Sequence, residues 1–335
     1  MVVDLHADSL LWNRDLLKRS NIGHIDCARL IDANVAVQVF GVVTKFSIGV
    51  YLKDFPLLID LVTFLSIIHK WPRQTRRDLF QRAVYQSAKL GKMIIESEGK
   101  MMLIKSIKDL DDLLALRKDH PRMIGSLLAL EGAHALNGDM ANLEKLYNSG
   151  FRIIGISHFI DNEAGGSAHG QKKEGLSGFG YRLVQKMQEM HMIIDLSHAS
   201  ERVVDEVTEI ATKPVIVSHT GVRRTCDSSR NISDERVKRI ARGGGMIGIA
   251  MFKKAVCGTR IKDTVRSIRH VADLVGVDHV GIGSDFDGAI TAPIDTTGLP
   301  LLTEELLSQG FDEGHVAKIM GGNALRVFRD ILPKE

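Results

Sequence analysis

The sequence has few of the residues that mark disulfide scaffolds, nucleic-acid binders or membrane proteins. Its 335 residues include only three cysteines, Cys27, Cys226 and Cys257, which lie far apart and form no Cys-x-x-Cys pair. An odd number without a framework predicts reduced thiols in a cytoplasmic protein. Lys and Arg number 44 against 41 Asp and Glu, and the formal charge of +3 favours neither nucleic acid nor an anionic membrane as a partner.

Long apolar runs are also missing. The most apolar window, Phe55–Ile68, contains Asp60 and is only 14 residues long. A bilayer span needs about 20 apolar residues, so this window predicts a buried amphipathic helix instead. The opening MVVDLHADSL has neither a basic region nor a long apolar region, so no signal peptide is expected. These absences predict a cytoplasmic protein without a membrane partner.

What the sequence does have is a repeated pattern, a short β-branched run followed by a longer helical stretch. The runs are continuously apolar rather than alternating, as expected for parallel strands covered on both faces. Eight strands are predicted: Val2–Asp8, Val35–Val43, Ile124–Glu131, Ile153–His158, Ile193–His198, Val215–His219, Met246–Met251 and His279–Asp285. Their alternation with helices favours an α/β fold, a closed (β/α)8 TIM-type barrel, with a doubly wound open sheet as the alternative.

A single barrel accounts for the whole length, so we expect one domain over residues 1–335. One connection is irregular, the stretch from about residue 44 to 122 after the second predicted strand. It is predicted to be a helical insertion, with a short apolar segment at Met101–Ile104. We do not expect it to form a separate domain.

Imidazoles and carboxylates gather at the carboxyl ends of the predicted strands. These residues are His6, Asp8, Glu131, His158, His198, His219 and Asp285. In a barrel all these ends open onto one mouth, the face that carries catalysis. His191 and His279 precede strands and are expected to be structural residues at the opposite face. The group at the mouth therefore predicts a metal site.

The types of these residues indicate which metal and which chemistry. His6 and Asp8 lie on the same side of their strand because side chains alternate with a period of two. Histidine and carboxylate without thiolate favour zinc, and manganese or cobalt less strongly. Buried carboxylates disfavour one another's ionisation, and a pair of metal ions bridged by Glu131 removes that conflict. Such a pair makes hydroxide available near neutral pH. A carboxylate must then pass a proton to the leaving amine, and Asp285 is favoured over its alternative Asp287.

Seven short motifs, in their order and spacing, resemble the membrane (renal) dipeptidase family of the amidohydrolase superfamily. They are D-L-H-A-D, L-E-G-A-H, I-S-H, D-L-S-H, V-S-H, S-R-N and G-S-D-F-D-G. The resemblance runs from residue 2 to the closing N-A-L-R-V-F at 323–328. It implies a metallo-dipeptidase that hydrolyses L-Xaa-L-Xaa or L-Xaa-D-Xaa dipeptides by metal-bound hydroxide. Many relatives in the superfamily bridge their metals with a carboxylated lysine on the fourth strand. Here that strand ends in His158, which agrees with a glutamate bridge.

The resemblance implies two Zn²⁺ ions per chain and a role for each metal-type residue. His6 and Asp8 hold the first zinc, Glu131 bridges the pair, and His198 and His219 hold the second. This assignment leaves the strand-four histidine and the last carboxylate for the substrate and its protons.

Three further roles are implied at the substrate. His158 polarises the scissile carbonyl and its oxyanion, and Asp285 is the acid/base. Arg230 binds the substrate carboxylate or the tetrahedral intermediate, although Arg223 and Arg224 precede it in the same loop. A small-molecule dipeptide is the expected partner, and a homodimer is left open.

Two other functions stay open at this point. A related amidohydrolase acting on N-acyl amino acids or other small amides has the same metal core. A non-catalytic barrel relative belongs to a different class, although such relatives usually lack a ligand or the acid/base group. The loop FIDNEAGGSAHG after the fourth strand departs from the family pattern, and its His169 faces either the pocket or solvent.

Overall fold

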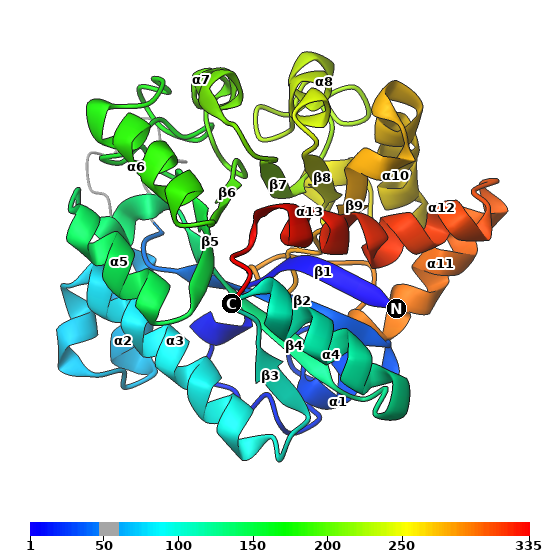
Figure 1. Ribbon diagram of the computed structural model, residues 1–335, viewed down its shortest axis with the longest axis horizontal. Helices are drawn as coiled ribbons and strands as arrows, with labels where there is room; N and C mark the ends of the chain where they lie inside the picture. Colours follow the sequence, from blue (N-terminus) through cyan, green and yellow to red (C-terminus); the bar gives the residue numbers. More distant parts are fainter. Residues whose placement is uncertain (47–59) are drawn as a thin grey trace.

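Parallel strands close into a barrel surrounded by helices (Figure 1). The computed structural model describes residues 1–46 and 60–335. The sheet order is β2-β1-β9-β8-β7-β6-β5-β4-β3, and β2 also pairs with β4, which closes eight strands into the barrel. The predicted (β/α)8 fold is confirmed, and the open sheet is wrong. The strands are β1 (Val2–Ala7), β2 (Val35–Val43), β3 (Met101–Leu103), β4 (Ile124–Glu131), β5 (Phe151–Gly155), β6 (Ile193–Asp195), β7 (Ile216–Thr220), β8 (Met246–Ile249) and β9 (Val280–Ile282).

The helices present an apolar stripe to the barrel. In α7, for example, Val203, Val204 and Val207 are buried at a helical spacing, and the Ser200 side chain caps the first turn. The α-helices are α1 (Cys27–Asp32), α2 (Leu61–Ile68), α3 (Leu79–Glu96), α4 (Ile107–Asp119), α5 (Met140–Asn148), α6 (Gly178–Glu189), α7 (Glu201–Ile210), α8 (Asp234–Arg242), α9 (Lys253–Val256), α10 (Ile261–Val275), α11 (Leu299–Ser308), α12 (Glu313–Ala317) and α13 (Asn323–Ile331).

The stretch 44–122 contains α2, α3 and α4 together with β3, which pairs with the start of β4. Of the apolar window Phe55–Ile68, residues 55–59 lie outside the described part. In the remainder, α2 leaves Phe64 58% exposed and Ile68 54% exposed, so the expectation of a buried helix is wrong there. Within residues 1–46 and 60–335, helices that combine the length and the apolar character of a membrane span do not occur.

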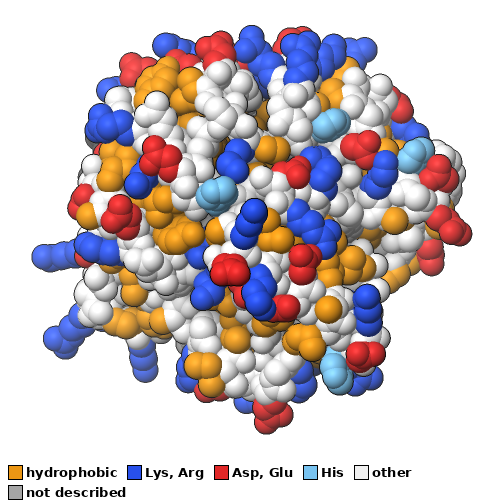
Figure 2. Space-filling view, in the orientation of Figure 1, with side chains coloured by type: hydrophobic (Ala, Val, Ile, Leu, Met, Phe, Trp, Pro, Cys, Tyr) orange, Lys and Arg blue, Asp and Glu red, His pale blue; other side chains and the backbone are white. Residues whose placement is uncertain are grey.

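The last helix, α13, closes the amino-terminal end of the barrel. Leu325, Val327 and Phe328 are buried in the same cluster as the inward-facing residues of the strands. Figure 1 shows α13 lying across this end. On the face shown in Figure 2, Lys and Arg side chains are interspersed with Asp and Glu. Arg329 of α13 forms an ion pair with Asp111 of α4. The barrel therefore offers its other end as the mouth.

His191 and His279, the two histidines that precede strands, lie at the closed end of the barrel, as expected. His191 contacts the Ile331 carbonyl through Nδ1 at 3.1 Å. His279 contacts the Gly245 carbonyl through Nδ1 at 2.8 Å. Because a carbonyl can only accept, both rings donate to the backbone. Their structural role is confirmed.

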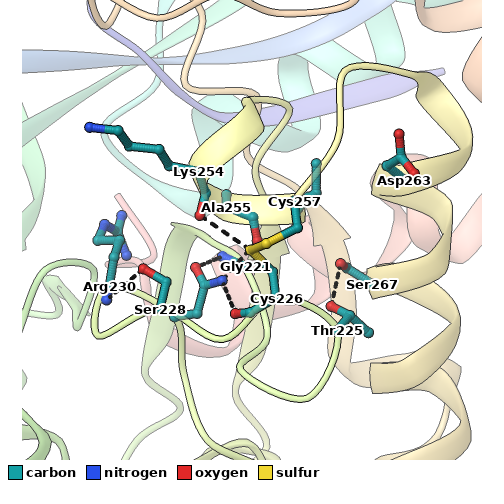
Figure 3. Close-up of a disulfide and its surroundings, with 12 residues drawn as sticks. Gly221, Thr225, Cys226, Ser228, Arg230, Lys254, Ala255, Cys257, Asp263 and Ser267 are labelled. Carbon is teal, nitrogen blue, oxygen red and sulfur yellow. Dashed lines mark hydrogen bonds between the residues drawn. A yellow bond between two sulfur atoms is a disulfide. The ribbon is translucent and has the colours of Figure 1, made fainter.

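The expectation of three reduced thiols is wrong for two of them. Cys226 and Cys257 form a disulfide with their Cα atoms 5.2 Å apart (Figure 3), while Cys27 is free and buried. The pair is separated by 31 residues along the chain. It meets because β7 and β8 are neighbours in the barrel, so the segments that follow them emerge side by side. Spacing along the sequence does not reveal that proximity.

Candidate metal centre

One carboxylate oxygen lies at the centre of four imidazoles at the barrel mouth. Glu131, the last residue of β4, places Oε1 3.5 Å from His6 Nε2 and 3.3 Å from His158 Nε2. The same oxygen is 3.1 Å from His198 Nε2 and 3.4 Å from His219 Nε2. All five side chains are buried. Glu131 therefore has the central position that a bridging ligand requires.

Two further carboxylates complete the group. Asp8 places Oδ1 3.2 Å from His6 Nε2. Asp285 offers an oxygen that lies within 4.8 Å of ligand atoms of both His6 and His219. The structure thus brings together all seven residues that the sequence singled out at strand ends. It does not separate His158 from the ligands by distance, since His158 is as close to Glu131 as the other histidines are.

Several site residues lie beyond the strands rather than on them. Asp8 follows β1 directly, while His158, His198 and Asp285 each come three residues after a strand ends. The predicted strands therefore extended one to three residues too far at these carboxyl ends. The backbone has already turned at these positions, with φ of 62° at His198 and 61° at Asp285. Left-handed backbone is strained for these residue types and is commonly found at functional sites.

A glycine on β2 makes room for the first pair of ligands. A Cβ atom on Gly41 would lie 2.5 Å from Asp8 Oδ1 and 2.7 Å from His6 Cε1. Any other residue would push these side chains away from the centre. The second strand therefore contributes space to the site instead of a ligand.

The charges of the site conflict when it holds no cation. Burial, followed by the charge of Asp8, raises the pKa of Glu131 to about 7. Burial and Asp8 also raise the pKa of Asp285 well above its ordinary value. Burial lowers the pKa of His198 and of His219 well below the ordinary value, so these rings are neutral. A bound cation relieves the carboxylates and uses the lone pairs of neutral imidazoles.

Polar atoms without partners point to the same conclusion. Among the described residues, His6 Nδ1 and Glu131 Oε2 are buried without a hydrogen-bond partner, and the 3.2 Å contact of His6 Nε2 with Asp8 Oδ1 does not have the geometry of a hydrogen bond. Such atoms are rare in proteins. His198 Nε2 and His219 Nε2 lie 2.9 Å apart and both face Glu131. Nitrogen and oxygen donors without thiolate fit zinc, so the residues present fit a metal centre.

Hydrogen bonds on the far ring nitrogens orient two of these histidines. Ser218 Oγ lies 3.0 Å from His219 Nδ1, and the Lys45 carbonyl lies 3.3 Å from His158 Nδ1. Ser218 Oγ in turn donates to the buried Asp195 at 2.5 Å. Such supporting contacts fix the ring orientation of metal-binding histidines.

Two buried aspartates were missed as supports of the site. Asp195, at the end of β6, also accepts from the Ser218 backbone at 2.8 Å. Asp4 on β1 accepts from the Ser284 backbone at 2.8 Å and from Ser284 Oγ at 2.6 Å, which holds the segment just before Asp285. The available signal was a charged residue inside a buried strand, since such a residue needs partners.

The structure separates Asp285 from its alternative Asp287. Asp287 accepts from Ser9 Oγ at 2.5 Å, from the His24 backbone at 2.7 Å and from the Arg14 guanidinium. Burial would raise the pKa of Asp287, but these hydrogen bonds and the Arg14 charge outweigh burial and lower it. Asp287 therefore joins two loops at the rim, while Asp285 faces the centre.

Asp287→Asn is expected to destabilise the protein by about 2 kcal/mol at pH 7, because Arg14 is left beside a neutral group. Urea unfolding of the metal-free protein measures this loss. The pKa of Asp287 is lowered on folding, so its stabilisation is present above the unfolded pKa and is lost in acid. The difference from the unsubstituted protein should therefore shrink below about pH 4. Full stability with loss of metal would instead make Asp287 a ligand.

Arg230 is the arginine of its loop that reaches the centre. It donates to the His219 carbonyl at 2.6 Å and lies 3.4 Å from His198 Nε2. Arg223, by contrast, pairs with Glu201 at 2.6 Å. The sequence left this choice among neighbouring arginines less secure, and the position of the side chain favours Arg230.

His169 lies beside the centre and not in open solvent. Its ring stacks on Phe159 with centroids 4.6 Å apart and lies 5.4 Å from the ring of His198. Its loop is attached to the site by a hydrogen bond from the Ala168 backbone to the His198 carbonyl at 2.7 Å. Burial, and then the charges of Arg230, Lys173 and Lys254, lower the pKa of His169 to about 3. His169 is therefore a neutral ring beside His198 at the mouth.

The amino-acid sequence is similar to those of known proteins. A model of the membrane dipeptidase family, peptidase family M19, matches residues 1–333. An uncharacterized protein in the pqqA 5' region of Klebsiella pneumoniae is 31% identical over 263 residues, which cover 73% of this chain and 94% of that protein. Dipeptidase 3 of Mus musculus is 30% identical over 225 residues, or 64% of this chain. The match spans only 46% of the length of the mouse protein.

Solved structures share the fold. A metallo peptidase from Rhodobacter sphaeroides, liganded with a phosphinate mimic of the dipeptide L-Ala-D-Ala, has a TM-score of 0.80 at 23% identity and covers 98% of this chain and 99% of that chain. A second metallo peptidase of family M19, dipeptidase AC, has a TM-score of 0.82 at 23% identity, with 99% and 98% covered. At this identity the likeness carries the barrel fold.

Proposed function

Because this chain belongs to the membrane dipeptidase family, peptidase family M19, we propose that it is a binuclear zinc dipeptidase. Its substrates are L-Xaa-L-Xaa or L-Xaa-D-Xaa dipeptides. The observation that carries the proposal is Glu131, whose Oε1 lies between 3.1 and 3.5 Å from four histidine Nε2 atoms. The dipeptide mimic held by the Rhodobacter sphaeroides relative supports this substrate class.

The metal-binding residues divide into two sets around Glu131. His6 and Asp8 would hold one Zn²⁺, and His198 and His219 would hold the other. Bound zinc supplies Lewis-acid polarisation of the scissile carbonyl and activates water near neutral pH. The alternative substrates, N-acyl amino acids and other small amides, would use the same residues.

Proton transfer and carbonyl binding fall to Asp285 and His158. Asp285 faces the centre and would take a proton from the attacking water and deliver it to the leaving amine. His158 donates Nδ1–H to the Lys45 carbonyl, so its Nε2 can donate to the substrate oxygen only when the ring carries both protons. Burial lowers the pKa of His158 well below its ordinary value, so the ring is neutral before substrate binds, and only the negative charge that develops on the carbonyl oxygen would favour the doubly protonated form in the transition state.

The substrate carboxylate would bind Arg230 on the β7 side of the mouth. Arg230→Ala is expected to lower kcat/KM for dipeptides about 30-fold, because a charge-assisted hydrogen bond contributes about 2 kcal/mol. Dipeptide amides, which lack the carboxylate, should lose much less. Steady-state kinetics on Ala-Ala and its amide measure both effects. Arg223→Ala is the matched control, since Arg223 pairs with Glu201. An equal loss on both substrates would show that Arg230 does not bind the substrate carboxylate.

The function as a whole is tested with metal-reconstituted protein and a library of L-Xaa-L-Xaa and L-Xaa-D-Xaa dipeptides. N-acyl amino acids belong in the same screen. Hydrolysis of dipeptides is expected. Turnover of N-acyl amino acids alone would favour the related amidohydrolase, and zinc binding without turnover of any amide would favour a non-catalytic relative.

We also propose a cytoplasmic location, although the Cys226–Cys257 disulfide removes the reduced thiols as an argument for it. The location was expected from reduced thiols, but disulfides persist mainly in oxidising compartments. Titration of free thiols in protein purified from its native compartment tests this directly. One free thiol per chain would match Cys27 and a retained disulfide, and would count against the cytoplasm. Sedimentation of the same sample would test the homodimer.

A further inference from the structure

A buried arginine of the helical insertion binds the backbone at the carboxyl end of β2. Arg82, on α3, is 1% exposed. Its guanidinium donates five hydrogen bonds, the number that its N–H groups allow. One of them goes to the carbonyl of Thr44, directly after β2, at 2.7 Å. The other acceptors belong to Asp60, Thr63, Thr75 and Arg76. Arg82 therefore joins the insertion to the end of β2 with its full set of donors.

Two further contacts hold the same end of β2. Gln86, one turn along α3 from the arginine, is buried and donates through Nε2 to the Val43 carbonyl at 2.9 Å. The backbone N–H of Leu61, at the start of α2, donates to the Phe46 carbonyl at 2.8 Å. Together with the arginine contact, these bonds bind the backbone to the insertion on both sides of Lys45. The position of the Lys45 peptide is therefore set by α2 and α3.

The Lys45 carbonyl in turn contacts a residue of the centre. It lies 3.3 Å from Nδ1 of His158. Because a carbonyl can only accept, the ring donates Nδ1–H, and its Nε2 lies on the side of the centre, 3.3 Å from Glu131 Oε1. A hydrogen bond on one ring nitrogen fixes the tautomer and the direction of the other nitrogen. The Lys45 carbonyl therefore sets how His158 faces the centre.

Burying a guanidinium is costly, and the contacts at β2 give this one a use beyond packing. We infer that Arg82 is a positioning residue for catalysis. It holds the Thr44 peptide, which places the Lys45 carbonyl, and this carbonyl holds the His158 ring toward the scissile carbonyl of the substrate. The inference rests on the proposed function, which gives His158 that role. The helical insertion thus acts on the centre through the backbone of β2.

Arg82→Met is expected to lower kcat for Ala-Ala about 10-fold, since a small misplacement of a catalytic group costs up to about 100-fold. KM should change less than about twofold, because His158 acts on charge that develops in the transition state. Steady-state kinetics measure both values, and metal content and Tm are measured on the same samples.

Arg117→Met is the matched control. Arg117 lies on α4 of the same insertion, is buried, and donates to the carbonyl of Val35 at the opposite end of β2, at 3.4 Å. Its substitution should lower Tm and leave kcat unchanged, because it acts at the closed end of the barrel. A loss of kcat in both variants would make the effect one of stability and would overturn the inference.

The role of His158 is tested by combining the substitutions. In a His158→Ala background, Arg82→Met should lower kcat no further, because the ring that it positions is absent. An equal loss in both backgrounds would overturn the inference. A second readout needs no activity. Long-range ¹H–¹⁵N spectra of the metal-free protein should show the Nδ1–H signal of His158 altered in Arg82→Met and retained in Arg117→Met. An unaltered signal in Arg82→Met would also overturn the inference.

Gln86→Met provides the same test if Arg82→Met does not fold. It removes one hydrogen bond from the Val43 carbonyl and should lower kcat about threefold, again only when His158 is present. Full kcat in folded Gln86→Met would then overturn the inference and leave the dipeptidase intact. Full kcat in His158→Ala would remove His158, and with it the inference, from an active enzyme. Failure of the unsubstituted protein to hydrolyse any dipeptide would overturn the proposed function itself.

Discussion

Asp285→Asn should retain its metal and lose about 10³-fold in kcat, because a positioned acid/base contributes about 10²- to 10⁴-fold. Asn has nearly the same shape as Asp but cannot accept the proton of the attacking water. Asp285 is buried and faces His6 and His219, so the substitution acts at the reacting centre. Steady-state kinetics on a dipeptide, together with metal analysis of the same sample, measure both properties.

Asp287→Asn is the matched control for this experiment, since it changes the same residue type two positions along the chain. It should keep kcat and lose stability, the reverse of the effect at Asp285. Loss of zinc from Asp285→Asn would contradict the acid/base role and make Asp285 a ligand, a reading that its distance to His6 and His219 allows.

The same variant has a second consequence in the metal-free protein. The pKa of Asp285 is raised on folding by burial and by the charge of Asp8. A raised carboxyl pKa means that stability is greatest below the unfolded pKa and falls as the pH rises toward the folded pKa. Metal-free Asp285→Asn escapes this loss. It should therefore be more stable than the unsubstituted metal-free protein at pH 7, with the advantage vanishing in acid, as thermal unfolding would show.

Glu131→Gln is expected to weaken both metal sites together, by at least about 100-fold in affinity. The reason is the position of Oε1, within 3.5 Å of histidines assigned to both ions. An amide at this position cannot offer a negative oxygen to each ion. Activity should fall with the metal, because bound zinc would supply the activation of water. Metal content after dialysis against a zinc buffer, measured by mass spectrometry, gives the stoichiometry.

Glu201→Gln is the control for loss of a carboxylate, since Glu201 pairs with Arg223 outside the centre. It should retain both ions. If Glu131→Gln released one ion and held the other at full affinity, Glu131 would be a ligand of a single site and the bridge would be wrong.

The sequence by itself determined the barrel and the group at its mouth. Continuous apolar runs between helical stretches are a local pattern, and local patterns are written directly in the order of residues. The period of two placed His6 and Asp8 on one side, and the shared end of parallel strands gathered Glu131 and His219 with them. The carboxyl ends of the strands were predicted less accurately, because the backbone turns at His198 and Asp285 are set by contacts at the barrel mouth.

The tertiary structure decided what depends on contacts between distant segments. The sequence favoured Asp285 over Asp287, but the partners that hold Asp287 away from the centre, Ser9 and Arg14 among them, became visible only in the fold. Cys226 and Cys257 meet only because β7 and β8 are neighbours in the closed sheet. Closure brings residues together at the cost of loop entropy, and no local pattern records which ones meet. The histidines at the mouth could therefore be found in the sequence, while their supports and the disulfide required the fold.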